Sequence, residues 1–266
     1  MYKLIALDMD GTLLRSDKTI SKTNFEAIQK AKVKGVKVVL ATGRPLIGIK
    51  KYLKELNLLD EGDYAVTYNG AVIQTTKNED IISANILSID DIDILYGISK
   101  KLGVNIHAFT KDYCITPKTS KYTLLEAKMN SISIKEMDFN NLPKDTSIIK
   151  IMFIDEEEIL DKVIAKLPKE LYDKYTIVRS APYFLEFLNK KVNKGVSVRL
   201  LAKKLGIDMK DVICAGDQGN DIHMVDFAGL GVAMENATDE LKKVANFVTK
   251  SNDEDGVAYV INKFIL

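Results

Sequence analysis

The sequence predicts an α/β protein with a doubly wound, mainly parallel, Rossmann-like sheet core and an inserted α+β unit. Short apolar runs alternate with helix-length segments at both ends of the chain, as is typical of parallel strands buried on both faces. This alternation stops near residue 84 and resumes after about residue 189. We therefore predict a core of residues 1–83 and 190–266, with residues 84–189 inserted as a cap domain.

Local signals predict the elements of the first part of the core. Leu4–Leu7 is an apolar run of strand length. Ser21 is a good N-cap for a helix, and Gly35 is placed to end it. Pro45 suits the first turn of a second helix. The predicted strands are 4–7, 36–40 and 64–68, and the predicted helices are 21–34 and 45–56.

The middle of the chain shows the order strand, helix, strand, strand twice. The first set is near 81, then 89–102, 104–109 and 113–115, and the second is 148–154, 156–167, 175–179 and 183–187. This faint duplication predicts a separate α+β unit. The core pattern then resumes with a helix from Lys194 and strands at 212–215, 231–233 and 246–249.

Composition narrows the class of protein. The chain has 266 residues, of which 46% are hydrophobic and 28% charged, as in an ordinary globular protein. A formal net charge of +1 gives no reason to expect a nucleic-acid or membrane partner. The sequence shows no signal peptide and no apolar run of about 20 residues, so we expect a cytoplasmic protein. Cys114 and Cys214 are far apart and predict neither a disulfide framework nor a zinc site.

The most informative stretch is Asp8-Met9-Asp10-Gly11-Thr12-Leu13, which directly follows the first predicted strand. Open α/β sheets bind ligands at the carboxyl ends of their strands. Gly11 allows the chain to turn, so that Asp8 and Asp10 face one pocket. Two carboxylates in one pocket repel each other unless a cation neutralises them, which favours a hard divalent metal.

Three further groups follow other predicted elements. They are Thr42, Gly43 and Arg44 after the second strand, Lys194 at the start of a helix, and Asp217, Asn220 and Asp221 after a later strand. A hydroxyl, backbone N–H groups and a lysine suit a phosphate dianion. Each group alone has an ordinary interpretation as a turn, a helix cap or a surface residue. Their convergence on one sheet edge favours a phosphate and Mg²⁺ site.

These four motifs, in this order, resemble those of the haloacid dehalogenase superfamily. The position and size of the insertion resemble the α/β cap of the Cof-type sugar phosphatases. Further segments match the same pattern: 68–71, 192–195, 231–237 and 253–258. The resemblance covers essentially the whole chain and implies a Mg²⁺-dependent phosphatase that acts on small phosphorylated metabolites, above all sugar phosphates.

The resemblance also implies a role for each residue. Asp8 would attack phosphorus, and Asp10 would be the general acid and base. Asp8, Asp217 and the Asp10 carbonyl would bind the metal. Asp221 would not bind it but would hold Asp217 and Lys194 in place. Met9, Thr42, Gly43, Lys194 and Asn220 would contact the phosphate, and Arg44 and Asn69 would reach the rest of the substrate. His107 and His223 are interpreted as packing or surface residues.

Two alternatives remain open. A sugar phosphomutase would pass the phosphoryl group from the same aspartate to another hydroxyl. A non-catalytic sensor of phosphorylated metabolites would keep the fold without the reaction, although none of the reactive residues is missing. The sequence leaves the oligomeric state and the physiological substrate open.

Overall fold

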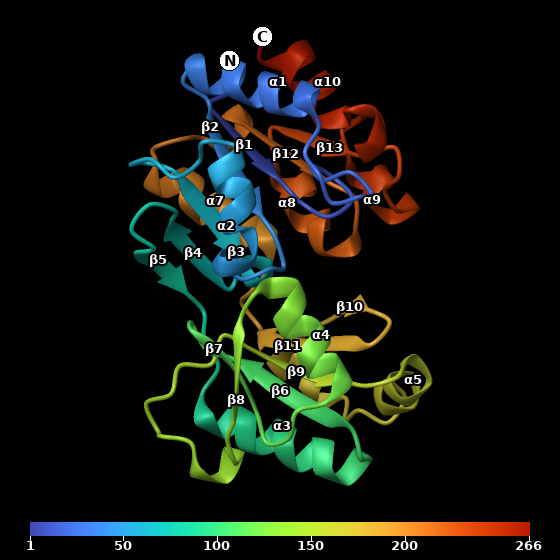
Figure 1. Cartoon of the computed structure of the whole chain (residues 1–266). Coiled ribbons are helices and arrows are strands. Elements are labelled where there is room, and N and C mark those ends of the chain that lie inside the picture. The colour runs from blue at the N-terminus through green and yellow to red at the C-terminus, as the bar shows by residue number, and fades with distance from the viewer. The chain divides into compact units, whose positions relative to one another are not determined.

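The computed structural model describes residues 1–266, which form two compact units (Figure 1). The first comprises Met1–Ser83 and Asn193–Leu266, and the second is Ala84–Val192. The second unit extends past the predicted residue 189 to Val192, which is buried and donates its N–H to the Asn189 carbonyl (2.9 Å).

The first unit contains an eight-stranded sheet in the order β14-β13-β12-β1-β2-β3-β4-β5. Neighbours from β14 to β3 pair in parallel, and β4 is antiparallel to β3. This confirms the mainly parallel sheet. The strands are β1 (Leu4–Leu7), β2 (Lys37–Ala41), β3 (Tyr64–Thr67), β4 (Val72–Thr75), β5 (Ile81–Ala84), β12 (Val212–Gly216), β13 (Leu230–Ala233) and β14 (Phe247–Val248).

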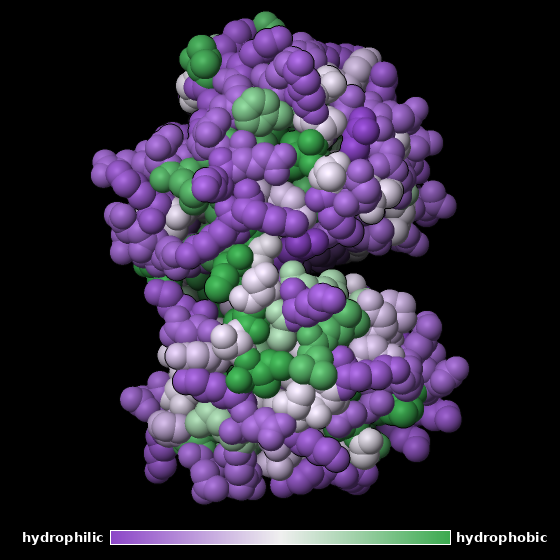
Figure 2. Space-filling model, viewed as in Figure 1, coloured by the Kyte–Doolittle hydropathy of each residue, from purple (hydrophilic) through white to green (hydrophobic).

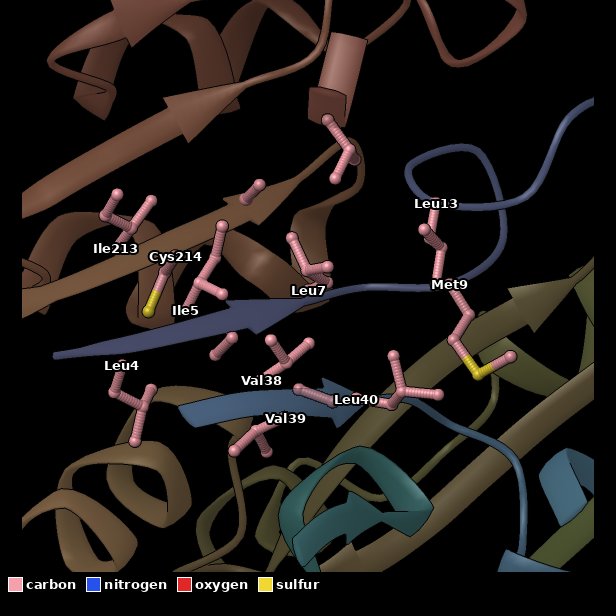
Figure 3. Close-up of a cluster of buried hydrophobic side chains, with 14 of the residues drawn as sticks. Leu4, Ile5, Leu7, Met9, Leu13, Val38, Val39, Leu40, Ile213 and Cys214 are labelled. Carbon is pink, nitrogen blue, oxygen red and sulfur yellow. The ribbon is translucent and has the colours of Figure 1, made fainter. Parts of the chain in front are cut away.

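Strand β1 lies in the middle of the apolar core of this unit. Ile5 pairs with Ile213 of β12 on one side and with Val38 of β2 on the other. Figure 3 shows side chains of β1 on both faces of the sheet, with Leu4 on one and Ile5 and Leu7 on the other. All of β1 is fully buried. A strand enclosed on both faces is a rigid support for the polar residues that follow it.

Helices flank the sheet of the first unit. They are α1 (Lys22–Val33), α2 (Leu46–Glu55), α7 (Lys194–Lys204), α8 (Ile222–Phe227), α9 (Asp239–Val244) and α10 (Gly256–Phe264). Helix α1 packs with α10, and α7 packs with α8 (Figure 1). The Ser21 side chain accepts a hydrogen bond from the Asn24 N–H (3.0 Å), which confirms it as the N-cap of α1.

The second unit contains a six-stranded sheet in the order β10-β11-β9-β6-β7-β8. Its strands are β6 (Asn105–Phe109), β7 (Tyr113–Thr116), β8 (Ser133–Glu136), β9 (Lys150–Ile154), β10 (Tyr175–Ala181) and β11 (Phe184–Asn189). Its helices are α3 (Ile89–Leu102), α4 (Lys121–Asn130), α5 (Glu157–Ile164) and α6 (Glu170–Lys174). All pairs are antiparallel except the parallel pair β7 and β8.

The sequence analysis overlooked α4 and β8. Helix α4 lacks apolar periodicity, because its buried residues are the polar Thr123, Glu126 and Asn130 and a single apolar residue, Ala127. The predicted helix over 156–167 corresponds to α5, which ends at Ile164, and the short α6 beyond Pro168 was also overlooked.

The burial of Glu126 in α4 has a cause in the sheet of the same unit. Lys150 of β9 is buried, and its Nζ lies 3.3 Å from Oε1 of both Glu126 and Glu186. Burial disfavours the charged lysine, but the two carboxylates outweigh it and hold the pKa of Lys150 above its ordinary value. The neighbouring His107 is fully buried, and burial together with Lys150 lowers its pKa to about 3. His107 is therefore a neutral packing residue.

We expect Lys150→Met to lower the free energy of unfolding by about 3–5 kcal/mol, because it removes the buried cation that two buried carboxylates contact. The matched control is Lys174→Met in the same unit, which removes the ion pair of a half-exposed lysine with Asp91 (2.8 Å), while Asp91 keeps its hydrogen bonds from Ser88 and Tyr175. We expect it to cost less than about 1 kcal/mol. The chain has no tryptophan, so urea unfolding would be followed by circular dichroism. An equal loss of unfolding free energy in both variants would contradict a special contribution of the buried ion pairs of Lys150 to stability.

The surfaces of the two units differ in character. Hydrophilic residues dominate the visible face of the first unit, whereas hydrophobic residues gather over the α4 region of the second (Figure 2). Leu124 and Met129 of α4 are exposed. Among all the helices, none has the length and apolar character needed to cross a membrane.

Candidate active site

Four adjacent strands of the first unit carry the candidate site at their carboxyl ends. Asp8 follows β1, Thr42 follows β2, Asn69 follows β3 and Asp217 follows β12. The Asp8 N–H continues the sheet by donating to the Ala215 carbonyl of β12 (3.0 Å). The sheet thus brings together residues from both ends of the chain, at the edge where such folds bind ligands.

Lys194 is the first residue of α7 and is fully buried between two carboxylates. Its Nζ donates to Oδ1 of Asp8 (2.5 Å) and to Oδ1 of Asp221 (2.6 Å). Burial opposes the charge of Lys194, but both carboxylates outweigh it and raise the pKa of the lysine. Lys194 therefore stays positive beside Asp8, whose other oxygen, Oδ2, accepts no protein hydrogen bond.

Asp221 is fully buried and completes its hydrogen bonds inside the protein. Its Oδ2 accepts the N–H groups of Asp217 (3.0 Å) and Gln218 (3.1 Å), while Oδ1 accepts from Lys194. A carboxylate with this many donors orients its neighbours rather than reacting. Asp221 therefore fixes both Lys194 and the turn of Asp217.

Asp217 is held close to Asp8. Its Oδ1 accepts the Thr12 hydroxyl (2.8 Å), and its Oδ2 accepts the Gln218 side-chain amide (3.2 Å). Gly11 makes this approach feasible, because a Cβ there would lie 2.3 Å from Oδ2 of Asp217. Gly11 also has φ +86°, a conformation that L side chains rarely adopt.

The acids of this cluster carry more negative charge than one lysine balances. Burial and the charges of Asp221 and Asp217 raise the pKa of Asp8 well above its ordinary value, despite Lys194. Burial and Asp221 also raise the pKa of Asp217. Carboxylate oxygens of Asp8, Asp217 and Asp221 all lie within 4.8 Å of one another. This buried oxygen set fits a hard divalent cation, which would offset the repulsion.

Asp10 has a different environment from Asp8. Arg44 binds it in a fork, with Nε 2.8 Å from Oδ2 and Nη2 2.6 Å from Oδ1, and Lys18 Nζ lies 2.9 Å from Oδ1. Burial opposes ionisation, but Arg44 and Lys18 outweigh it and hold the pKa of Asp10 below its ordinary value. Tyr52 supports this arrangement, because its hydroxyl donates to the Lys18 carbonyl (3.1 Å).

Thr42, Gly43, Asn69 and Asn220 form another side of the site. Asn69 is buried and donates its N–H to the Thr42 carbonyl (2.9 Å). The Asn220 amide donates to Oδ1 of Asn69 (3.0 Å). A Cβ on Gly43 would lie 3.1 Å from the same Oδ1. Asn69 therefore links the loop after β2 to the loop after β12.

The structure brings the sequence-predicted residues together within the first unit. Arg44 contacts Asp10, and its expected contact with the substrate stays a prediction. The Met9 side chain is fully buried in the core, so its backbone alone is available to a ligand (Figure 3).

Sequence reasoning missed Thr12, Lys18 and Gln218 as site residues. Thr12 lies inside the first motif, so its hydroxyl was visible as a candidate. Lys18 gave no signal, because it reaches Asp10 through a chain reversal in which it has φ +66°.

The fold and this arrangement of charges define a class of enzyme that handles phosphate groups with a carboxylate and a cation. Residues 5–261 match the family of haloacid dehalogenase-like hydrolases, and the chain belongs to this family. Members of the family that are phosphatases generally use a divalent metal.

Curated relatives agree with this assignment. The chain is 45% identical over 268 residues to the Bacillus subtilis (strain 168) protein named "Putative phosphatase YxeH", covering 100% of this chain and 99% of that one. It is 33% identical over 265 residues to the 5-amino-6-(5-phospho-D-ribitylamino)uracil phosphatase YcsE of the same organism, covering 99% and 96%.

Solved structures show the same fold. A haloacid dehalogenase-like hydrolase from Bacteroides thetaiotaomicron matches with a TM-score of 0.89 and 34% identity, covering 100% of both chains. The subclass IIB sugar phosphatase BT4131 matches with a TM-score of 0.82 and 25% identity, covering 98% of each chain. Together these findings identify the chain as a phosphatase.

Proposed function

We propose that the chain is a Mg²⁺-dependent phosphatase that hydrolyses small phosphorylated metabolites, above all sugar phosphates, through an aspartyl-phosphate on Asp8. The observation that carries this proposal is the placement of Asp8, with Oδ1 on Lys194 and Oδ2 without a protein partner. The names of YcsE and BT4131, a phosphatase of a ribityl phosphate and a sugar phosphatase, support the substrate class.

In the first step, Oδ2 of Asp8 would form a bond to phosphorus while the bond from phosphorus to the sugar oxygen breaks. Asp10, in its protonated form, would give its proton to that oxygen. Since Arg44 and Lys18 keep Asp10 ionised in the structure, this step requires those contacts to weaken. Lys194 would stabilise the negative charge that gathers on the transferring group.

In the second step, water would attack phosphorus and the bond from phosphorus to Asp8 would break. Asp10, ionised as the structure has it, would take the proton from water. The Thr42 hydroxyl, the Asn220 amide and the N–H groups of Met9 and Gly43 would orient the phosphoryl oxygens.

Asp8, Asp217 and the Asp10 carbonyl would hold Mg²⁺. Asp221 is less suited to this role, because Lys194 and two backbone N–H groups already occupy its oxygens. When bound, the ion would offset the repulsion between Asp8 and the phosphoryl group. We further propose that the second unit, inserted between the second and third motifs, is the cap that selects the substrate.

Phosphate release from a panel of sugar phosphates, nucleotides and cofactor phosphates, with MgCl₂ or with EDTA, tests this function. We expect metal-dependent release that is fastest with sugar phosphates. Asp8→Asn, purified in parallel, controls for contaminating phosphatases. Isomerised sugar phosphate without free phosphate would indicate a mutase. Neither product, from a folded protein that binds Mg²⁺, would indicate a sensor.

We expect Mg²⁺ to stabilise the protein more at pH 7 than at pH 5. A ligand at a hundredfold excess over its Kd adds about 2.7 kcal/mol to the free energy of unfolding. Burial and neighbouring carboxylates raise the pKa values of Asp8 and Asp217, so these groups destabilise the metal-free protein as the pH rises above about 3.9, the usual aspartate pKa. Mg²⁺ removes that penalty, whereas protons compete with it at low pH.

The measurement is the Tm with MgCl₂ and with EDTA at the two pH values. Asp217→Asn should lose the increase in Tm that MgCl₂ produces. Asp211→Asn, which changes a surface pair with Lys3 (2.8 Å), should keep that increase. An increment that does not depend on Asp217 would contradict the assigned site.

A further inference from the structure

Two loops near the end of the chain hold the turn that follows Asp10. Asn236 donates from Nδ2 to the Gly11 carbonyl (2.8 Å), and Asn252 donates from Nδ2 to the Leu14 carbonyl (2.9 Å). The two asparagines also bind each other, because Oδ1 of Asn236 accepts the Asn252 N–H (3.0 Å). They form a continuous bridge between the two ends of this turn, which we call the asparagine bridge.

The next residues of the turn are held by the same part of the chain. Asp253 accepts the N–H of Ser16 (2.9 Å) and its hydroxyl (2.6 Å). Arg15 Nη2 lies 3.3 Å from Oδ1 of Asp255. These contacts give a physical role to the segments 231–237 and 253–258, whose sequences contribute no group to the proposed reaction.

The position of this turn matters because the residues on both sides of Gly11, Asp10 and Thr12, belong to the candidate site. Asp10 directly precedes Gly11, and the Thr12 hydroxyl donates to Asp217 (2.8 Å). The Leu13 N–H donates to the Asp8 carbonyl (3.3 Å). A shift of the turn would therefore move Asp10 and Thr12 relative to Asp8 and Asp217.

We propose that Asn236 and Asn252 are positioning residues for the reaction, which fix Asp10 and Thr12 through the backbone carbonyls of Gly11 and Leu14. This inference rests on the proposed phosphatase reaction. Neither side chain needs to touch the substrate, because each acts through the turn.

Asn236→Asp tests the hydrogen bond from the Asn236 side chain to the Gly11 carbonyl. The aspartate keeps an oxygen for the Asn252 N–H but places its second oxygen, in place of a donor, against the Gly11 carbonyl. Asn236 is exposed, so the fold should persist. We expect kcat to fall by about 10- to 100-fold with KM changed by less than about twofold, since misplacement affects the reacting geometry more than binding.

Asn246→Asp is the matched control. The Asn246 side chain accepts the Gly231 N–H through Oδ1 (2.7 Å), and an aspartate keeps that hydrogen bond with the same change of charge. We expect kcat of the wild type. Asn252→Asp removes the donor to Leu14 at a buried position and should lower kcat further. If Asn252→Asp does not fold, Asn236→Asp decides the question.

Hydrogen exchange followed by mass spectrometry separates positioning from general loss of stability. In Asn236→Asp, the peptide covering residues 8–16 should exchange faster, while the peptide covering β12 should exchange at the wild-type rate. Wild-type exchange in residues 8–16, or kcat within about twofold of wild type, would overturn the proposal. The exchange measurement needs no turnover, so it tests the bridge even if the wild type proves not to release phosphate.

Discussion

Replacing Asp8 by asparagine is expected to lower kcat for phosphate release by about 10⁴- to 10⁶-fold, the range seen when one member of a catalytic triad is removed. An amide of the same shape cannot form the acyl-phosphate bond, so no covalent intermediate accumulates. Lys194 keeps its second partner, Asp221 (2.6 Å), so the buried lysine is not left unpaired. The loss would therefore lie in the chemistry and not in the fold.

The stability of Asp8→Asn provides a second test of the same assignment. Burial and the charges of Asp221 and Asp217 raise the pKa of Asp8, which means that the charged form is disfavoured in the metal-free protein. Asparagine removes that charge. In EDTA at pH 7 we expect a Tm at or above the wild-type value, with a smaller gain on adding MgCl₂.

Steady-state phosphate release and circular dichroism with and without MgCl₂ measure both effects. Asp211→Asn is the control, because it makes the same change at a surface pair with Lys3. Retention of more than about one per cent of wild-type kcat by Asp8→Asn would remove Asp8 as the nucleophile.

The central strands of the first unit could be predicted from the sequence for a physical reason, although β4, α9 and α10 were overlooked. These strands are buried on both faces, so β1 and β12 appear as uninterrupted apolar runs, and β2 and β3 are apolar except for Lys37 and Thr67 at one end of each. In the second unit, α4 buries the polar residues Thr123, Glu126 and Asn130, and Glu126 pairs with the buried Lys150 of β9. A helix of this kind carries no apolar stripe, and only the folded sheet reveals its partner.

The residues of the candidate site also divide into those that the sequence predicts and those that only the folded structure reveals. Asp8, Asp10 and Asp217 could be predicted because they lie in dense motifs at the ends of the buried strands β1 and β12. Lys18 could not, because its contact with Asp10 depends on a left-handed residue in a loop. The asparagine bridge could not either, since Asn236 and Gly11 lie 225 positions apart along the chain.

Asp10→Asn is expected to lower kcat for sugar phosphates by about 10²- to 10⁴-fold, the usual contribution of a general acid and base. The asparagine keeps one oxygen for Arg44 Nη2 and Lys18 and loses only the acceptor for Arg44 Nε, so the site should stay assembled without its proton donor and acceptor. Asp17→Asn is a control in the same loop, because it keeps an acceptor for the Thr19 N–H (3.0 Å) and hydroxyl (2.6 Å).

The choice of substrate separates the two tasks of Asp10. The leaving group of p-nitrophenyl phosphate departs as a stable anion and needs no proton, so Asp10→Asn should still transfer its phosphoryl group to Asp8. Without a base to activate water, the aspartyl-phosphate should then persist. Rapid-quench kinetics should show a burst of nitrophenol equal to the enzyme concentration, and mass spectrometry should find the phosphoryl group on the peptide that contains Asp8. With a sugar phosphate the burst should be absent, because the first step also needs the acid. A burst with both substrates would limit Asp10 to the role of base, and wild-type turnover with both would remove it from the reaction.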